Sequence, residues 1–487
     1  MDWLLLVQIV YVCILFIVCL RIIYDTRSAI KTLSYLLVAV FIPVIGILIY
    51  FSFGINYRKR KIYHKKLYQD ENLAKKQLLK IYSYSKETFS KSASFLQENK
   101  ELALMLLRDS GSPLTGNNEV KLLINGEQKF PEVIAALENA RHHIHMEYYI
   151  YEDDEIGKTI EEILIRKAKE GVTVRFIYDD FGSSSIRKTT VTRLKENGVH
   201  CMPFYKIRFL WLANSLNYRN HRKIIVIDGK VSFVGGINIS DRYINRPEDA
   251  GNPDKIYWRD THLKIEGPGT YFLQYVFLSD WNFCAKDNIE PDSNLFPDMQ
   301  SIKKGDKMVQ IAASGPDSDN PLIMYSLIQA IYLAQKEILI TTPYFIPGES
   351  ILDALIISAL GGVKVKLLIP GYSDSIFVNF ASRSYYSDLL SAGVEIYFYK
   401  KGFVHAKTMV TDGATAIVGT ANMDQRSFDL NFEVNAIVYN KEIAEQLRDA
   451  FYEDIKDAEK IDRDRWSKRK TYIKLMEKTA RLVSPML

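Results

Sequence analysis

The chain has 487 residues and a formal net charge of +5 at pH 7, and this length predicts two or three domains rather than one. Such a small net charge does not favour a nucleic-acid-binding protein, so we expect no nucleic-acid partner. The four cysteines, Cys13, Cys19, Cys201 and Cys284, form neither a C-x-x-C motif nor a disulfide framework, which argues against a disulfide-stapled secreted domain and favours a reducing compartment.

Two apolar runs at the N-terminus predict membrane-spanning helices. Trp3 to Leu20 is interrupted only by Gln8, and Thr32 to Phe53 carries no charge. Each run is long enough to cross a bilayer core. The first run lacks the basic start and the small-residue cleavage site of a signal peptide, and a buried core helix is the alternative for the second. We therefore expect residues 1–55 to form a transmembrane helical hairpin, with spans at about 3–20 and 32–53.

Basic residues after the second run indicate on which side of the membrane the rest of the chain lies. Six lysines and arginines lie between 58 and 66, against three in the loop that joins the two runs. This difference favours the cytoplasmic side for everything after residue 55. Residues 56–118 remain rich in lysine and helix-prone. They predict a basic helical linker that is either solvated or held against an anionic membrane surface.

From about residue 119 onward, helical and strand patterns alternate, and they do so twice. GVTVRFIYD at 171–179 aligns with GVKVKLLIP at 362–370, and ENGVHCMPF at 196–204 aligns with SAGVEIYFY at 391–399. Strands separated by helices predict an α/β fold with a mostly parallel sheet and helices on both faces. We expect two duplicated α-β-α halves, 119–300 and 301–487, packed into one body.

HRKIIVIDGKVSFVGGIN at 221–238 predicts a β-hairpin with its turn at Asp228-Gly229. On a strand, His221 and Lys223 are two residues apart and therefore point to the same face. The pair suits a phosphate, because histidine can attack it or donate a proton and lysine neutralises its oxygens. Asp228 is interpreted as fixing the turn rather than touching substrate.

The connection that precedes this hairpin contains an insertion of aromatic and apolar residues at 204–217. The corresponding connection in the second half, from Gly393 to His405, is shorter. The insertion could reach into the bilayer or line an acyl-chain channel, and it could equally form a lid or an extra core strand. The pattern leaves these alternatives open.

A second copy of the hairpin pattern lies near the end of the chain, in His405, Lys407 and Asp412. Gly419 and Asn422 follow it at the same distances at which Gly235 and Asn238 follow the first copy. Two core hairpins that carry these residues by chance are the alternative, but two copies with matching tails make coincidence a poor explanation. The residues predicted to be catalytic are His221, Lys223, Asp228, His405, Lys407 and Asp412.

The C-terminal stretch from Trp466 predicts an amphipathic helix. Apolar positions recur at spacings of three and four, namely Tyr472, Leu475, Met476, Thr479, Leu482 and Val483. Basic residues occupy the remaining surface, namely Lys468, Arg469, Lys470, Lys474 and Lys478. One interpretation packs the apolar stripe on the body of the protein, so that Leu475→Asp would destabilise the fold. The other also places the basic face on an anionic leaflet.

The paired motifs resemble those of the phospholipase D superfamily, in which two HKD motifs form one active site between two halves. Within it, the chain is most similar to bacterial cardiolipin synthases over almost its whole length, through segments such as NYRNHRKIIVIDG, WRDTHLKIEGPG and GTANMDQRSFDLNFE. The resemblance implies that Glu433 and Asp260 orient the histidines, although a plain surface or strand-end charge is the alternative for either carboxylate. It further implies substrate binding by Asn238, Asn422, Gly235, Gly236, Gly419 and Thr420.

The resemblance implies transfer of a phosphatidyl group from one phosphatidylglycerol to another, giving cardiolipin and glycerol. His221 would form a phosphohistidine and His405 would act as acid and base. It also implies a multi-pass protein of the bacterial cell membrane. No metal or other cofactor is expected, because no acidic cluster accompanies the motifs. A hydrolytic phospholipase D, a phosphatidylserine-forming transferase and an inactive membrane scaffold are the alternatives, and the oligomeric state stays open.

Overall fold

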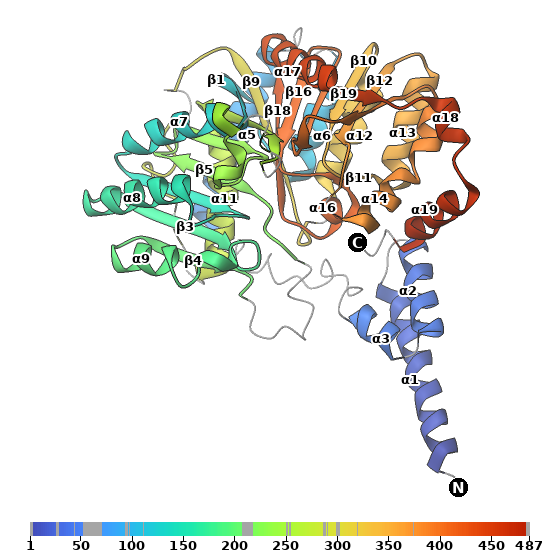
Figure 1. The fold of residues 1–487 in the computed structure, drawn as a ribbon. Coiled ribbons are helices and arrows are strands. Elements are labelled where there is room, and N and C mark those ends of the chain that lie inside the picture. Colours follow the sequence, from blue (N-terminus) through green and yellow to red (C-terminus); the bar gives the residue numbers. More distant parts are fainter. Residues whose placement is uncertain are drawn as a thin grey trace.

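The structure is a computed structural model in which one central sheet carries helices on both faces (Figure 1). The described residues are 3–25, 29–42, 44–51, 71–92, 96, 98–110, 112–206, 218–249, 252, 255–285, 289, 291–298, 302–318, 320–373 and 375–483. Among them, fifteen strands form this sheet, and its two ends belong to the two halves of the chain.

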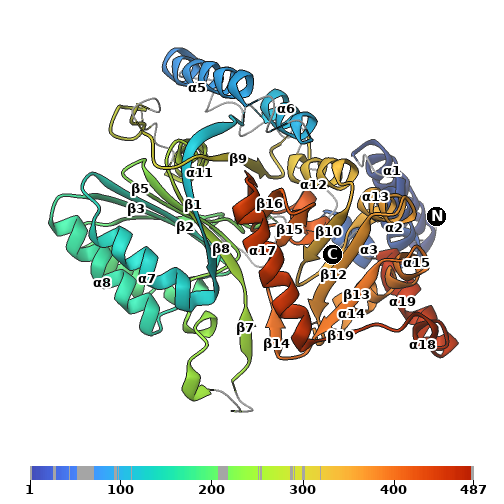
Figure 2. The same cartoon turned by 90° about the horizontal axis from the view of Figure 1, so that it is seen from above.

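The first half contributes seven strands, which lie in the spatial order β1, β8, β6, β5, β2, β3, β4. Their bounds are β1 Thr115–Ile124, β2 His143–Tyr148, β3 Thr173–Asp179, β4 His200–Phe204, β5 Lys223–Ile227, β6 Val231–Gly235 and β8 Thr261–Glu266. The helices are α7 Asn125–Glu138, α8 Glu155–Lys169, α9 Thr190–Glu196 and α11 Thr270–Ala285, with 3-10 turns at Ser184–Ile186, Asp241–Tyr243 and Pro247–Asp249. Figure 2 shows α7 and α8 on one side of these strands and α11 on the other.

The second half repeats this order from β9 outward, as β9, β18, β16, β15, β10, β12, β13, β19. The bounds are β9 Lys307–Ser314, β10 Glu337–Thr341, β12 Lys364–Pro370, β13 Glu395–Tyr399, β15 Thr408–Thr411, β16 Thr415–Gly419, β18 Glu433–Tyr439 and β19 Ala458–Lys460. Its helices are α12 Leu322–Leu333, α13 Gly348–Leu360, α14 Ile376–Arg383, α15 Tyr386–Ser391, α16 Gln425–Asp429, α17 Lys441–Asp454, α18 Arg463–Ser467 and α19 Thr471–Val483, with a 3-10 turn at Ile455–Asp457. The predicted duplication is confirmed.

The prediction of a mostly parallel sheet is wrong. Only the outer strands are parallel, β2 with β3 and β4 in one half and β10 with β12 and β13 in the other. Every other neighbouring pair in the sheet is antiparallel. Helical crossovers connect the outer strands, whereas hairpins and the long central strands β1 and β9 form the middle, so the helix–strand alternation describes only the ends of the sheet.

Both predicted hairpins are present. β5 pairs with β6, and β15 pairs with β16. Asp228 and Gly229 have φ of 51° and 61°, and Asp412 and Gly413 have φ of 55° and 62°. Positive φ at both central residues is the geometry of the two-residue turn that follows the right-handed twist of a hairpin, and Asp-Gly is among its preferred sequences.

The two halves share one hydrophobic core. Leu273 and Val276 of α11 and Leu447 and Phe451 of α17 belong to a single buried cluster with strand residues from both halves. Two further clusters lie between the strands and the outer helices of each half. The short strands β7 (Tyr257–Arg259) and β14 (Gly402–Val404) also pair across the halves. The halves therefore form one body, and a site between them has fixed walls.

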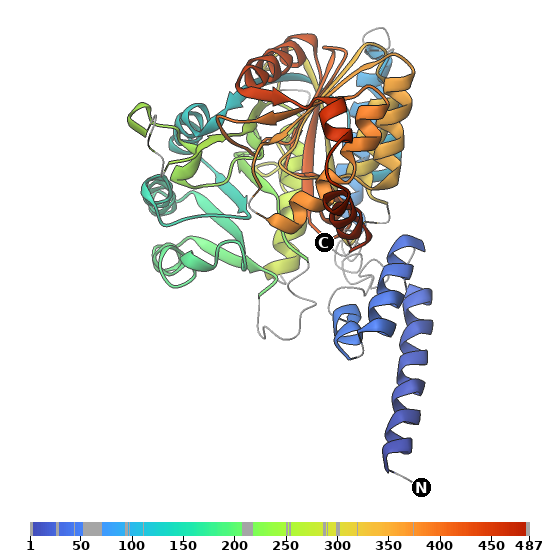
Figure 3. The ribbon, with the colours of Figure 1, turned by 45° about the vertical axis from the view of Figure 1, so that its right-hand side comes forward.

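The N-terminal helices project from one end of this body (Figure 3). α1 (Trp3–Asp25) contains the stretch Leu5–Asp25, which is long and apolar enough to cross a membrane and is almost entirely unburied in the protein. It is the only such helix in the described ranges. Most of its apolar side chains are exposed in the described structure, as is expected of a helix surrounded by lipid.

The second predicted span, 32–53, does not form one continuous helix in the described residues. α2 (Ala29–Phe41) ends just before Pro43, and α3 (Ile45–Ile49) follows after a break. A Cβ at Gly46 would lie 2.1 Å from the carbonyl oxygen of Val38, so α3 approaches the backbone of α2 closely. Residues 43, 52 and 53 of the predicted span lie outside the described residues.

The predicted basic helical linker is partly built into the body. Residues 56–70 lie outside the described residues, but α5 (Glu71–Lys91) and α6 (Lys100–Ser110) follow them. Ser85 of α5 accepts a hydrogen bond from the backbone N–H of Leu114 at 2.9 Å. Leu102 and Leu106 of α6 are fully buried in the core of the second half. This segment therefore packs on the fold instead of remaining solvated.

The C-terminal helix α19 forms as predicted, but it packs through a different face. Glu477 and Ala480 are buried, and Glu477 pairs with Arg469 at 3.0 Å and with Arg383 of α14 at 3.2 Å. The predicted apolar stripe faces outward, since Tyr472, Leu475, Met476 and Leu482 are 49–66% exposed. The interpretation that packs the apolar stripe on the body does not agree with this arrangement, because an ion pair and a small residue make the contact instead.

Candidate active site

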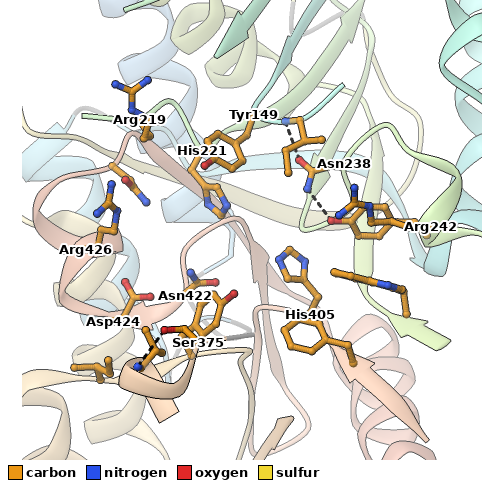
Figure 4. Close-up of a pocket in the computed structure, with 18 of the residues that line it drawn as sticks. Tyr149, Arg219, His221, Asn238, Arg242, Ser375, His405, Asn422, Asp424 and Arg426 are labelled. Atoms are coloured by element: carbon orange, nitrogen blue, oxygen red, sulfur yellow. Dashed lines mark hydrogen bonds between the residues drawn. The ribbon is translucent and has the colours of Figure 1, made fainter. Parts of the chain in front are cut away.

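A cavity of about 420 Å³ lies between the two halves, and both motif histidines line it. Figure 4 shows the rings of His221 and His405 facing each other across it. His221 precedes β5 and His405 precedes β15, so each imidazole stands at the start of a buried strand. The sequence prediction that the two motifs meet in one site agrees with this placement.

His221 is oriented by a carboxylate from the other half of the chain. Its Nδ1 lies 3.0 Å from both carboxylate oxygens of Glu433, the first residue of β18. The Thr420 hydroxyl donates to Glu433 Oε2 at 2.5 Å, and the Asn431 amide donates to Oε1 at 3.2 Å. With Nδ1 donating to this fixed carboxylate, Nε2 is the unprotonated nitrogen and is free for chemistry in the cavity.

His405 has the equivalent arrangement, with a carboxylate from the first half. Its Nδ1 lies 2.7 Å from Asp260 Oδ2, on a residue of the first half between β7 and β8. The backbone N–H of Thr261 donates to Asp260 Oδ1 at 2.7 Å. Asp260 itself donates its backbone N–H to Asn125 at 2.9 Å, which fixes the loop. The alternative for Asp260, a plain strand-end charge, does not fit a fully buried carboxylate on a histidine.

The backbone explains why each carboxylate reaches the opposite half. The N–H of His221 donates to the carbonyl of Phe432, and the N–H of His405 donates to the carbonyl of Arg259. In each case the next residue along the chain supplies the carboxylate. The sequence pattern identifies the two carboxylates, but it does not show this exchange between halves, because the pairing depends on how the halves dock.

The motif lysines lie behind the histidines. Lys223 Nζ donates to the carbonyl of His221 at 2.7 Å. Lys407 Nζ donates to the carbonyl of His405 and lies 3.0 Å from both of its ring nitrogens. Both lysines are buried, so their charges act in a low-dielectric environment.

Burial shifts the pKa of all four groups. It lowers the pKa of His221 to about 4 and that of His405 to about 3, although Glu433 and Asp260 act in the opposite direction. It lowers the pKa of Lys223 to about 7 and that of Lys407 to about 8. Both imidazoles are therefore neutral at pH 7, which is the nucleophilic form.

The motif aspartates lie in the hairpin turns and do not line the cavity. Asp228 accepts hydrogen bonds from the backbone N–H groups of residues 141, 142 and 143 at 2.8–2.9 Å. Asp412 accepts the equivalent bonds from residues 335, 336 and 337 at 2.7–2.8 Å. Each aspartate ties its hairpin to the start of the neighbouring strand, so we assign it a positioning role, not a catalytic one.

The two asparagines and the four small residues divide into two groups. Asn238 and Asn422 line the cavity, and Asn238 donates to the Tyr243 hydroxyl at 2.7 Å. The residues Gly235, Gly236, Gly419 and Thr420 do not line it. A Cβ at Gly236 would lie 2.2 Å from Asp260 Oδ1, and one at Gly419 would lie 1.9 Å from Asn435 Oδ1. Gly236 thus packs against Asp260, Gly419 packs against Asn435, and Thr420 bonds to Glu433, so their role in substrate binding stays a prediction.

Several cavity residues lie outside the set that the paired motifs predicted. They are Tyr149, Arg219, Arg242, Trp258, Phe403, Asp424 and Arg426, together with Ser375 and Val378 of α14. Arg219 and Phe403 each stand two residues before a motif histidine, and this periodicity could have identified them. Most of the aromatic insertion, residues 207–217, lies outside the described residues.

In the described part of the chain, no group of three or more His, Cys, Asp or Glu side chains is arranged to hold a metal ion.

Two family models and many known relatives match this chain. A family model described as cardiolipin synthase, PLD-like domain, matches residues 133–251 and 327–455, and one described as phospholipase D-nuclease N-terminal matches 13–54. A cardiolipin synthase of Geobacillus sp. (strain WCH70) is 42% identical over 463 residues, covering 95% of this chain and 90% of that protein. One of Listeria welshimeri is 40% identical over 464 residues, covering 95% of both chains.

Among solved structures, the fold is similar to that of phosphatidylserine synthase from Haemophilus influenzae Rd KW20. The match has a TM-score of 0.56 and 14% sequence identity, and it covers 76% of this chain and 95% of the other. At this identity the likeness concerns the fold alone.

Proposed function

Since the chain belongs to the cardiolipin synthase family of phospholipase D-like phosphatidyltransferases, we propose that it joins two molecules of phosphatidylglycerol through a covalent phosphohistidine. The observation that carries this proposal is the pair of neutral imidazoles facing one cavity, each held by a carboxylate from the other half. Paired in this way, one imidazole can form a covalent bond to phosphorus while the other handles the proton.

In the first step, His221 Nε2 attacks the phosphorus of the donor lipid. The bond from phosphorus to the glycerol oxygen breaks, and His405 gives its proton to that oxygen as glycerol leaves. His405 must gain this proton first, and the negative charge of the bound phosphodiester favours its protonated form. The assignment of His221 as nucleophile follows the resemblance to the superfamily.

The charge that develops on the phosphoryl oxygens needs nearby donors. Lys223 and Lys407 supply positive charge from behind the histidines, and Asn238 and Asn422 present amide groups at the cavity wall. Because protein cations occupy these positions, we expect the reaction to continue in the presence of EDTA. Loss of activity on chelation, with recovery on adding Mg²⁺, would contradict this expectation.

The choice of acceptor can be tested directly. Vesicles of phosphatidylglycerol alone should yield cardiolipin and free glycerol in equal amounts. A hydrolytic phospholipase D would instead give phosphatidic acid, because water would take the phosphatidyl group. Failure to form any product or to trap a phosphohistidine would favour an inactive scaffold.

The membrane arrangement extends this proposal. α1 would anchor the protein, α2 and α3 would form the return to the same side, and the body would lie on the cytoplasmic side with access to phosphatidylglycerol and cardiolipin. The Ser34 hydroxyl donates to the carbonyl of Leu482 at 3.1 Å, which ties α2 to α19. The C-terminal helix thus lies beside the membrane anchor (Figure 1).

An outward apolar surface next to this anchor would contact the bilayer. We call it the apolar rim, and it consists of Ile376 and Phe377 of α14 and Tyr472, Leu475, Met476 and Leu482 of α19, all 40–78% exposed. Ser375 and Val378, beside the α14 part of the rim, line the cavity. Exposed basic residues lie next to the rim, including Lys470 and Lys478, and suit an anionic leaflet.

A further inference from the structure

The cavity wall beside His221 carries two guanidiniums that the attack of His221 on the donor does not require. Arg219 and Arg426 both line the cavity, and Figure 4 shows them on the side of His221. Three arginines and one aspartate line the cavity in the described part of the chain. The lining is therefore cationic even before the buried lysines are counted, and it can hold more than one anion.

Arg219 is held at a short distance from the reacting histidine. It lies two residues before His221 in an extended segment, so the two side chains share a face and their Cα atoms lie about 6.6 Å apart. Asp179 approaches the Arg219 guanidinium to 3.5 Å, while its carboxylate accepts shorter bonds, 2.9–3.0 Å, from three backbone N–H groups. The loop therefore fixes where the guanidinium stands.

Tyr149 lines the same cavity as the two arginines and lies beside His221. Its ring stands edge-on to His221, with centroids 4.9 Å apart. Burial and then Asp179 raise the pKa of the Tyr149 phenol, while Arg426 and Arg219 both act in the opposite direction. Both guanidiniums thus act at one point next to the nucleophile, although they come from different halves of the chain.

The second step of the reaction brings another phosphate into this space. The terminal hydroxyl oxygen of the acceptor forms a bond to phosphorus, the bond from phosphorus to His221 breaks, and the hydroxyl proton goes to His405. The acceptor carries its own phosphodiester at the other end of the same glycerol. That second anion must lie one glycerol away from the phosphohistidine, and its charge needs donors there.

We propose that Arg219 and Arg426 form a subsite for the phosphodiester of the acceptor, so that the enzyme selects a phosphate-bearing alcohol over water or a neutral alcohol. The inference rests on the proposed function, since it concerns the second step of that reaction. Guanidiniums suit the task because they bind phosphate oxygens through two parallel hydrogen bonds and stay charged.

The test measures how the phosphatidyl-enzyme divides between two acceptors. Full-length enzyme in mixed micelles of detergent and phosphatidylglycerol is given radiolabelled glycerol, and the initial rates of cardiolipin formation and of label entry into phosphatidylglycerol are compared. Both products come from one intermediate, so their ratio does not depend on the donor step or on the fraction of folded enzyme. We expect Arg426→Gln and Arg219→Gln each to lower this ratio about tenfold.

A matched control and a third acceptor sharpen the result. Arg246→Gln removes the same charge outside the cavity, where Arg246 is paired with Glu155, and should leave the ratio at the parent value. Glycerophosphoglycerol, which has the phosphodiester but no acyl chains, should lose reactivity in the two variants as phosphatidylglycerol does. An unchanged ratio, or an equal fall with Arg246→Gln, would overturn the subsite. A parent enzyme that exchanges glycerol but makes no cardiolipin would instead refute the proposed function.

Discussion

The two sides of the cavity have the same skeleton and different chemistry. Each histidine donates to a carboxylate of the other half, and each is preceded two residues earlier by a cavity-lining side chain. Beside His221 that residue is Arg219, whereas beside His405 it is Phe403. The residue two positions before each carboxylate also lines the cavity. It is Asn431 before Glu433 and Trp258 before Asp260. The duplication therefore preserves the catalytic geometry, while the surroundings of the two histidines have diverged.

The aromatic side is defined by three rings around one imidazole. The ring centroids of Tyr243, Trp258 and Phe403 lie 6.0, 5.6 and 6.1 Å from that of His405. Beside His221 only Tyr149 stands in such contact among the described residues. An apolar wall suits the glycerol and acyl parts of a lipid, and a cationic wall suits phosphates. Two lipids that bind together would therefore prefer one orientation across this nearly symmetric site.

The largest expected effect is the loss of either histidine. His221→Ala and His405→Ala should each lower cardiolipin formation by about 10⁴-fold or more, because nucleophile and acid act as one unit. The comparison of sides predicts a difference in the trapped intermediate: acid-quenched enzyme should carry the phosphatidyl group on His221. A phosphopeptide that maps to His405 would reverse the roles, and near-normal turnover in either variant would end the shared-site mechanism.

The next effect concerns the exchanged carboxylates. Glu433→Gln and Asp260→Asn should each lower kcat by about 10²-fold or more, because the neutral amide no longer fixes the tautomer and charge of its imidazole. The exchange between halves makes a specific prediction. Glu433→Gln should slow formation of the phosphohistidine on His221, whereas Asp260→Asn should slow protonation of the leaving glycerol.

The effects of these two carboxylate variants can be distinguished by changing the leaving group of the donor lipid. A donor lipid with a good leaving group, such as a nitrophenol, needs little protonation, so it should rescue Asp260→Asn and not Glu433→Gln. Rapid-quench measurement of the first turnover provides the readout. Equal rescue of both variants would show that the two sides do not differ in role.

The motif spacing predicts the hairpins, the duplication and the six motif residues, because Asp-Gly turns and strand patterns are local. The exchange of carboxylates, the mostly antiparallel sheet and the cationic wall depend on how distant segments dock. Residue patterns carry little of that information. The outward stripe of α19 shows the same limit, since periodicity predicts an apolar face but not whether protein or lipid covers it. Buried Glu477 makes the contact instead.

The pH dependence is a smaller effect that both sides share. Burial lowers the pKa of Lys223 to about 7 and that of Lys407 to about 8. The protonated lysines are the forms that attract phosphate, so kcat/KM should fall as pH rises through this range, although a free lysine would keep its charge to about pH 10. The initial rate at low donor concentration provides the measurement. A profile that stays flat to about pH 10 would contradict buried lysines as the source of charge.

The smallest expected effect tests whether the aromatic side continues to the bilayer through α14 and α19. Leu475 is 64% exposed and faces away from the body, whereas Ala480 on the same helix is 5% exposed. We expect Leu475→Asp to change the free energy of unfolding by no more than about 0.5 kcal/mol, because an exposed side chain loses no packing in the protein. Ala480→Asp, the matched control, should destabilise the helix contact, because it buries a charge.

The same pair of variants should behave differently toward lipid. Full-length Leu475→Asp should form cardiolipin a few-fold more slowly in phosphatidylglycerol vesicles, because an inserted apolar side chain becomes a charge, yet match its parent in detergent micelles that deliver lipid without a bilayer. Charge reversal at Lys470 and Lys478 should add a loss that is greatest at low salt, since the attraction to an anionic leaflet is screened over about 10 Å at 0.1 M ionic strength. The contrary outcomes are that Leu475→Asp unfolds the protein, or that it slows cardiolipin formation equally in vesicles and in micelles. Either result would show that α19 has only a structural role and that the lipids reach the aromatic wall by another route.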